Sequence, residues 1–192
     1  MNPRPARPYE MLVRHCLTRP LPFRLAEFGA GTLQVGARLP SDRETWALDE
    51  NSPALRLLSP FYTGSLALRE PRAPLAPASC HLVVFSACVF SSFPLAALVQ
   101  EGFRLLLPGG ELWLEASAPA PWTRWAGPGR RWPAPRRFRE TREALAAHGA
   151  LPASLRCLPF TLSPSPLLSA LIPYYPWLAE RRWVVGLQGK DS

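Results

Sequence analysis

Residues 23–32 read Phe-Arg-Leu-Ala-Glu-Phe-Gly-Ala-Gly-Thr, a short apolar run that ends in an acid and then turns through two glycines. Glycine permits the backbone angles of a tight turn and lets the main chain approach a ligand closely. This order of residues is typical of a buried strand that leads into a loop beneath a nucleotide-like ligand. The Gly-x-Gly pair alone is a weak signal, because the third glycine of a dinucleotide fingerprint is missing.

A second strand is predicted about twenty residues further on, at the distance expected for a ribose-binding acid. Residues 44–50 read Glu-Thr-Trp-Ala-Leu-Asp-Glu, so this strand also ends in acids. An acid at that point can hold both hydroxyls of a ribose. Ser52-Pro53 follows and predicts the start of a helix, with Ser52 as the N-cap and Pro53 in the first turn.

Strands and helices alternate along the rest of the chain. Apolar runs and helical spacing predict strands at 23–28, 45–49, 62–68, 81–86, 111–116, 154–162 and 182–188, and helices at 8–18, 32–39, 52 onward, 93–106 and 136–148. Alternation of this kind implies right-handed crossovers and a parallel sheet with helices on both faces. We therefore expect an α/β fold with a Rossmann-like, doubly wound sheet.

The 192 residues suit one domain with a substantial core, and we expect residues 1–192 to form it, with a lead segment at 1–22. The net charge is 22 − 14 = +8, carried mostly by arginine. A basic surface favours anionic partners without specifying nucleic acid. Four scattered cysteines (Cys16, Cys80, Cys88 and Cys157) form no Cys-x-x-Cys pair, so we expect reduced core thiols and no metal site.

No apolar signal-peptide core opens the sequence, which favours a cytoplasmic protein. Two long stretches lack charge, at 82–99 and 161–179. Serines and a proline interrupt the first stretch and four prolines interrupt the second, whereas a spanning helix needs roughly twenty predominantly apolar residues. We expect no membrane span in either.

Three segments together resemble the class I S-adenosylmethionine-dependent methyltransferases. Glu27-Phe-Gly-Ala-Gly-Thr32 is similar to the first motif of that family, Asp49-Glu-Asn-Ser-Pro53 is similar to the second, and Arg104-Leu-Leu-Leu-Pro-Gly-Gly-Glu-Leu112 is similar to the turn before the fifth strand. The resemblance spans about residues 23–187. It implies a sheet of about seven strands, mostly parallel with an antiparallel last strand, and S-adenosyl-L-methionine as the cofactor.

The same resemblance implies cofactor-binding residues. By its first motif, Glu27 would help to hold the methionine end of the cofactor, directly or through water, and the Gly29–Gly31 loop would pass beneath the cofactor at that end. By its second motif, an acid would bind the ribose of the cofactor. Alignment without gaps on Ser52-Pro53 makes this acid Glu50, whereas the geometry of the strand end makes it Asp49. Asn51, beside them, is also expected at the cofactor. Ser86 and Ala87, after the fourth strand, would line the floor of the site.

Three positions depart from the family pattern. Leu33 replaces a frequent glycine. The acid that the family has just upstream of residues 73–75 is replaced around Arg69-Glu70. His81 stands where an aspartate commonly opens the fourth strand. These departures weaken the adenine-site assignment and leave open a catalytically silent descendant of the fold.

No catalytic residue is assigned from the sequence. Methyl transfer from a sulfonium is an in-line displacement that positioning alone can accelerate strongly, so an obvious catalytic dyad is not required. The loop Ser86-Ala-Cys-Val-Phe90 is neither the Asn-Pro-Pro-Tyr pattern of amino-directed nucleic-acid methyltransferases nor the Pro-Cys pair of cytosine-C5 enzymes. Cys88 is predicted to be structural, and the sequence leaves His81 or His15 as candidate bases.

Residues 118–139 form a proline-rich insert in which four aromatic residues alternate with six arginines and no acid between residues 122 and 139. Such a pattern can stack on bases and neutralise phosphate. A cover over the acceptor pocket, with locally packed tryptophans and solvated arginines, explains it as well and is the interpretation we favour.

The sequence thus predicts S-adenosylmethionine-dependent methyl transfer to a small-molecule acceptor that it does not identify. An RNA-directed methyltransferase that uses residues 118–139 for docking is one alternative, and a silent binding protein of the same fold is another. A nicotinamide-dependent oxidoreductase is disfavoured by the missing third glycine. The acceptor atom and the oligomeric state are not specified by the sequence.

Overall fold

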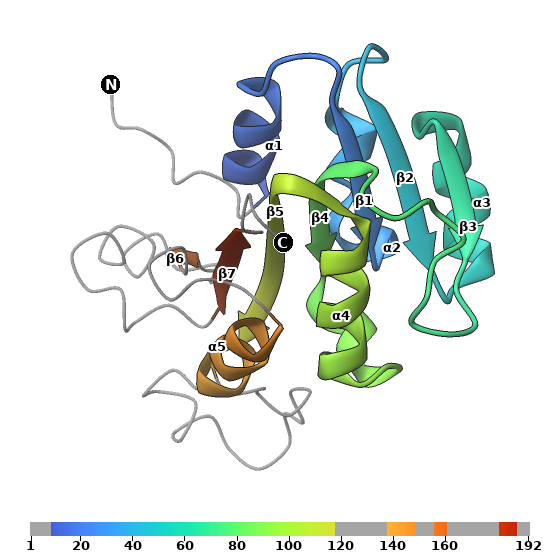
Figure 1. Cartoon of the computed structure of the whole chain (residues 1–192). Helices are drawn as coiled ribbons and strands as arrows, with labels where there is room; N and C mark the ends of the chain where they lie inside the picture. Colours follow the sequence, from blue (N-terminus) through green and yellow to red (C-terminus); the bar gives the residue numbers. More distant parts are fainter. Residues whose placement is uncertain (1–8, 118–137, 149–155, 161–180, 188–192) are drawn as a thin grey trace, which may run out of the picture.

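The structure is a computed structural model that describes residues 9–117, 138–148, 156–160 and 181–187. Strands alternate with helices along the described chain (Figure 1). The elements are α1 (Glu10–Leu17), β1 (Arg24–Phe28), α2 (Ala30–Leu33), β2 (Glu44–Asp49), α3 (Ser52–Leu58), β3 (Gly64–Ala67), β4 (Cys80–Phe85), α4 (Leu95–Leu105), β5 (Leu106–Ser117), α5 (Phe138–Ala147), β6 (Arg156–Phe160) and β7 (Arg181–Leu187), with 3-10 turns η1 (Gly36–Arg38), η2 (Ser59–Phe61) and η3 (Ala87–Ser91).

All the strands join one seven-stranded sheet in the order β3-β2-β1-β4-β5-β7-β6. The pairs among β1 to β5 are parallel, whereas β7 runs antiparallel to both β5 and β6. Strand order reverses between β1 and β4, because the chain winds outward from β1 in one direction and from β4 in the other. The predicted Rossmann-like, mostly parallel sheet with an antiparallel last strand is confirmed.

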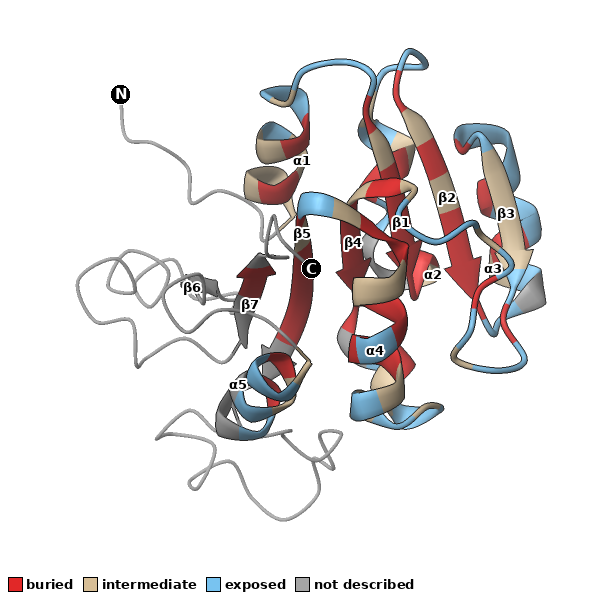
Figure 2. Cartoon of the chain, viewed as in Figure 1, coloured by how far each residue is buried: buried red, intermediate tan, exposed pale blue. Residues whose placement is uncertain are grey.

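Two apolar layers cover the sheet from opposite sides. Alternate side chains of β1 and β4, such as Phe28 and Phe85, pack with α4 and α5 on one face. The intervening side chains, such as Leu25 and Leu82, pack with α1 on the other face, where α2 and α3 also lie against β2. Figure 2 shows that buried residues follow the central strands, whereas the outer sides of the helices are exposed.

Two element boundaries differ from the sequence prediction. The helix expected at 32–39 is replaced by one turn, α2, and the 3-10 turn η1, separated at Gln34, whose φ is 54°. The fifth strand, expected from residue 111, begins at Leu106 directly after α4. The ladder with β4 shifts register between the Cys80–Leu106 and Leu82–Glu111 pairs, so the strand accommodates Pro108-Gly109-Gly110 as an irregularity.

Of the four cysteines expected in the core, Cys16 and Cys80 are buried, whereas Cys88 is exposed. Burial raises the pKa of Cys16 to about 12, which keeps this thiol protonated and inert. The prediction for Cys88 was wrong because the turn after β4 places it at the surface.

A buried carboxylate anchors the loop that precedes β4. The Glu101 side chain of α4 is 5% exposed and accepts a hydrogen bond from the backbone N–H of Ala73 at 2.8 Å. Arg104, one turn later, donates to both Glu101 oxygens and to the carbonyls of Ala73 and Leu75. Hydrogen bonds to Glu101 raise the pKa of Arg104, so its guanidinium stays charged, and its bonds fix α4 and residues 73–75 together.

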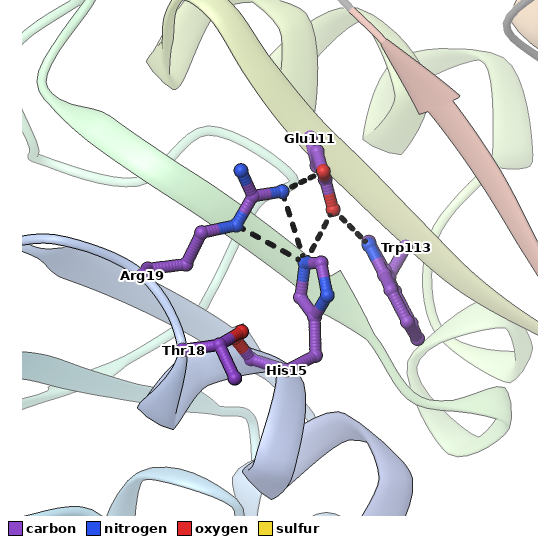
Figure 3. A network of polar contacts seen from close by, with 5 residues as sticks. All are labelled: His15, Thr18, Arg19, Glu111 and Trp113. Atoms are coloured by element: carbon purple, nitrogen blue, oxygen red, sulfur yellow. Dashed lines mark hydrogen bonds and ion pairs between the residues drawn. The ribbon is translucent and has the colours of Figure 1, made fainter.

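A polar network joins the end of α1 to β5 (Figure 3). His15 Nε2 lies 2.7 Å from Glu111 Oε2, and Trp113 Nε1 donates to the same oxygen at 2.8 Å. Arg19 forms an ion pair with the other Glu111 oxygen. Since Glu111 pairs with Leu82 near the start of β4, the network lies toward the amino ends of the strands. His15 is therefore placed away from the edge where a ligand would sit, and not as a candidate base there.

His81 is also at the amino end of the sheet, where it opens β4. Its Nδ1 accepts a hydrogen bond from the backbone N–H of Arg24 at 3.1 Å, and its ring stacks on Phe23. Burial, and after it the charges of Arg24 and Arg19, lower the pKa of His81 below its ordinary value of 6.5. The Nδ1 lone pair of His81 is thus used within the fold, and its place at the amino end of the sheet puts it away from the edge where a ligand would sit.

We expect acid to destabilise the fold through His81. Because its pKa falls on folding, its contribution to stability is complete above pH 6.5 and is lost as the pH falls through the lowered value. His81→Asn keeps an acceptor for Arg24 but does not titrate. Urea unfolding between about pH 5 and 7.5 should therefore show a smaller loss of stability in this variant than in the wild type. His148→Asn, which removes a histidine at the end of α5, is the control, and parallel curves for the wild type and His81→Asn would contradict the assignment.

Candidate functional site

Three loops meet at the carboxyl edge of the sheet, beside the reversal of strand order. Backbone bonds extend the strand ladder into them: Gly29 N–H donates to Leu48 O at 2.7 Å, and Ser86 N–H donates to Phe28 O at 3.0 Å. The residues that follow β1, β2 and β4 are therefore held side by side. In open α/β sheets, ligands bind outside the carboxyl ends of the strands at such a switch point.

Gly29 is required by both its conformation and its surroundings. Its φ is +76°, and a Cβ at this position would lie 2.0 Å from Ser86 Oγ and 2.7 Å from Cys88 Sγ. The turn after β1 is thus in close contact with the turn after β4, which begins with the backbone of Ala87 in η3. Ser86 itself is buried, at the floor of this junction.

Asp49, the last residue of β2, connects the ends of two strands. Its Oδ2 accepts a hydrogen bond from the backbone N–H of Gly31 at 2.9 Å, and its Oδ1 accepts one from Asn51 N–H at 2.8 Å. A carboxylate has about four acceptor positions, and these bonds use two of them. A Cβ on Gly31 would lie 3.1 Å from Asp49 Oδ2, so the absence of a side chain permits this approach.

Glu50 and Asn51 are placed differently from Asp49. Asp49 is 7% exposed and therefore buried, whereas Glu50 is exposed to solvent. Asn51 caps α3, since its side chain accepts a hydrogen bond from Ala54 N–H at 3.2 Å. The helix start was predicted correctly to within one residue, but the N-cap is Asn51 and not Ser52.

Glu27 is fully buried beneath the loop that follows α2. Its Oε1 accepts a hydrogen bond from Val35 N–H at 3.0 Å, and its Oε2 accepts from Gly36 N–H and from the Tyr62 hydroxyl, each at 2.8 Å. Burial raises the pKa of Glu27, and these hydrogen bonds oppose the increase. These donors reach both oxygens of the carboxyl group, so Glu27 supports the loop from within.

Two buried residues, one beneath the loop after α2 and one near the end of β5, were missed by sequence reasoning. Tyr62 could not be connected to Glu27, because 35 positions separate them in the sequence. Glu115 is 1% exposed and follows Leu114, which pairs with Phe85 directly before Ser86. An acid within the apolar run of β5 is the signal that could have identified Glu115.

Side-chain alternation places Glu115 on the same face of the sheet as Trp113, two residues earlier in β5. Trp113 packs with Val84 of β4 in the layer that α1 covers, and Ser86 follows Val84 by two residues. Ser86 and Glu115 therefore lie on one face at one level of the sheet. Together with Gly29, they put a hydroxyl, a carboxylate and a turn without a side chain along the carboxyl edge.

The described residues contain no group of three or more His, Cys, Asp or Glu side chains that could hold a metal ion. Among the helices that the structure describes, none is long and apolar enough to cross a membrane. The uncharged stretch at 82–99 comprises most of β4, η3 and the first part of α4. The second uncharged stretch, at 161–179, and residues 118–137 of the Trp/Arg-rich insert lie outside the described residues.

Comparison with protein-family models gives no match to this sequence, and no curated protein matches it. Solved structures do match. One is a possible histamine N-methyltransferase from Thermotoga maritima, with a TM-score of 0.68 and 15% identity over 94% of this chain and 88% of that chain. Another is geranyl diphosphate C-methyltransferase from Streptomyces coelicolor, with a TM-score of 0.66 and 13% identity over 94% and 78% of the two chains.

A third match is the CMeT domain of the citrinin polyketide synthase, with a TM-score of 0.61, 21% identity and 88% coverage of this chain. The chain spans about half of that structure (47%) and of the CurJ carbon methyltransferase (53%). At these identities the likeness concerns the fold. The chain has the fold of the class I S-adenosylmethionine-dependent methyltransferases.

The contact between Gly29 and Ser86 predicts a difference between the two glycines of the loop. Gly29→Ala should lower the free energy of unfolding by about 2–4 kcal/mol, because it adds left-handed strain and a steric overlap. Gly31→Ala should cost less than Gly29→Ala, because no positive φ is involved and its Cβ would meet Asp49 Oδ2 at 3.1 Å and Ala54 Cβ at 3.2 Å, which small shifts of these neighbours can relieve. Urea unfolding measures both. Adding Ser86→Gly to Gly29→Ala should restore part of the loss, and no recovery would show that the overlap is not with Ser86.

Proposed function

We propose that this chain is an S-adenosylmethionine-dependent methyltransferase that acts on a small-molecule acceptor. The observation that carries the proposal is the Asp49 carboxylate bonded to the backbone of Gly31 at the carboxyl edge of β1 and β2. This arrangement joins a ribose-binding type of acid to a loop that contains two glycines, next to the switch point of a methyltransferase-type sheet. The likeness to solved methyltransferases supports the same interpretation at the level of the fold.

The residues present fit such a cofactor. Asp49 retains acceptor capacity for ribose hydroxyls beyond its two backbone bonds, and the bare backbone of Gly31 beside it permits close approach. Between the two acids at the end of β2, burial and the bond to Gly31 favour Asp49 over the exposed Glu50 for the ribose. Gly29, Ser86 and Ala87 would form the floor at the methionine end, and Asn51 would act through its cap of α3.

The chemistry asks little of the protein beyond placement. When bound, S-adenosylmethionine supplies an electrophilic methyl group on a sulfonium. The chain has to align an acceptor in line with that methyl and to exclude water, and alignment alone can contribute several kcal/mol to lowering the barrier. We assign the acceptor side to β4 and β5, where Glu115 could orient an acceptor group or take its proton.

Calorimetry with S-adenosylmethionine and with S-adenosylhomocysteine tests the proposal without knowledge of the acceptor. We expect saturable binding of both and none of NAD. Absence of binding by a folded protein would overturn the proposal. Binding without methyl transfer to any acceptor in a broad panel would favour the silent binding protein. An RNA-directed activity depends on residues 118–139 and predicts RNA affinity that falls steeply with salt.

The two acids at the end of β2 should contribute unequally. Removing a buried hydrogen-bonding partner costs roughly 1–3 kcal/mol, so Asp49→Asn should weaken S-adenosylhomocysteine binding by about one to two orders of magnitude. Glu50→Gln is the matched control and should bind within about twofold of the wild type, because exposed charges contribute little. Calorimetric titration of both variants decides between them. If Glu50→Gln weakens binding more than Asp49→Asn does, the ribose-binding acid is Glu50, as the ungapped alignment on Ser52-Pro53 indicated.

Glu115 should affect turnover and not cofactor affinity. Glu115→Gln is expected to reduce methyl transfer to an identified acceptor by at least about tenfold, because general-base or orienting groups typically contribute 10²–10⁴-fold. Affinity for S-adenosylhomocysteine should stay nearly unchanged. Glu111→Gln changes the same residue type on the same strand, in its middle and toward the amino edge of the sheet, and is the control. Equal turnover in both variants would remove Glu115 from the acceptor site.

A further inference from the structure

We propose that Tyr62 is a positioning residue that orders residues 29–36, here called the cofactor loop, through Glu27. In this proposal Glu27 supports the cofactor loop and is not a ligand of the cofactor. The inference rests on the proposed function and assigns a task to a residue that the sequence motifs do not contain. Tyr62 lies between η2 and β3, is 8% exposed, and donates its hydroxyl to Glu27 Oε2 at 2.8 Å.

Glu27 is the point on which two consecutive backbone N–H groups converge. Val35 donates to Oε1 and Gly36 donates to Oε2. Such a convergence is possible because Gln34 is in the left-handed conformation, which turns the chain back over β1. The Tyr62 hydroxyl supplies the donor that comes from outside this loop, so it connects the loop to the segment before β3.

The ring of Tyr62 also fills the space beside Gly36. A Cβ on Gly36 would lie 2.3 Å from Tyr62 Cε1 and 2.9 Å from Cδ1. The ring thus lies against the backbone of the residue whose N–H binds Glu27. Tyr62 restrains the end of the loop in two ways, by packing on Gly36 and by sharing its acceptor.

The other end of the loop is restrained by Asp49. Gly31 N–H binds Asp49, and Gln34 N–H binds Ala30 O at 3.1 Å, so α2 bridges the two acids. A change at Tyr62 therefore reaches the ribose acid through Glu27, residues 34–36 and α2. Its effect should be felt by any ligand that uses Asp49, whether or not that ligand has an amino acid portion.

Electrostatics favour a lasting role for the hydroxyl. Burial, and after it the neighbouring Glu27, raise the pKa of Tyr62 above its ordinary value of 10. The hydroxyl therefore stays protonated at neutral pH and remains a donor to Glu27. Removal of this donor leaves the buried Glu27 carboxylate with fewer hydrogen bonds. A buried acceptor that loses its partner is costly, and the loop is the part that can move in response.

The experiment compares two ligands in Tyr62→Phe. S-Adenosylhomocysteine carries the amino acid portion, and 5′-methylthioadenosine lacks it. We expect Tyr62→Phe to weaken both by a similar factor, about 5- to 20-fold, as for one lost buried hydrogen bond. Phe61→Ala, which changes the exposed neighbouring residue, is the control and should leave both affinities within about twofold. Unchanged affinities in Tyr62→Phe would overturn the proposal.

Glu27→Gln separates support from direct binding. If Glu27 held the amino group of the ligand, this variant would weaken S-adenosylhomocysteine and spare 5′-methylthioadenosine, and that result would also overturn the proposal. A similar loss for both ligands supports it. Circular dichroism establishes that each variant is folded before titration.

Hydrogen exchange gives a readout that needs no ligand. The amides of Val35 and Gly36 should exchange faster in Tyr62→Phe than in Phe61→Ala, because their common acceptor is less firmly held. Exchange at the control rate would contradict the proposal even if both ligands bind. If wild-type protein binds neither ligand, the proposed function fails, whereas the exchange measurement still decides whether Tyr62 orders this loop.

Discussion

The buried carboxylate of Glu27 is the constraint on which the ligand edge depends. A carboxyl group enclosed in a sheet loses its hydration, and hydrogen bonds from the protein have to replace it. Burial raises the pKa of Glu27, and the hydrogen bonds that it accepts oppose this increase. Here the donors are the backbone N–H groups of Val35 and Gly36 and the Tyr62 hydroxyl. The chain has to turn back over β1 to bring them there. That requirement explains the left-handed Gln34, the single turn of α2 and the place of Gly31 beside Asp49.

Two acids at neighbouring strand ends thus have separate tasks. Glu27 is fully buried and supports the loop, whereas Asp49 lies at the carboxyl edge. Each oxygen of Asp49 accepts one described backbone hydrogen bond, from Gly31 or from Asn51. The motif resemblance treated both as ligands, because a motif records residue types and not burial. An acid can remain in a motif for the support it gives to the backbone, and a binding role then has to be shown for each acid separately.

The sequence predicted those parts of the fold that depend on local pattern. The apolar runs of β1 and β4 and the helical spacing of α4 are visible within a window of a dozen residues, and the structure has them where they were expected. The break at Gln34 could not be predicted, because its cause is a carboxylate seven positions earlier and a tyrosine 35 positions after that carboxylate. The sequence left the choice between Asp49 and Glu50 open for a similar reason, since only the packed structure distinguishes the buried acid from the exposed one.

The two edges of the sheet show how little a residue type alone says about function. At the amino edge, His15 pairs with Glu111 and His81 accepts a backbone N–H, so residues with catalytic chemistry serve as connections between elements. At the carboxyl edge, Ser86 and Glu115 lie on one face beside a glycine that tolerates no side chain. Position relative to the switch point, and not chemistry alone, separates the two sets. Because fold likeness at low identity extends to the sheet and not to these side chains, the acceptor has to be sought from Glu115 and the end of β5, the part of the edge that the family motifs leave undefined.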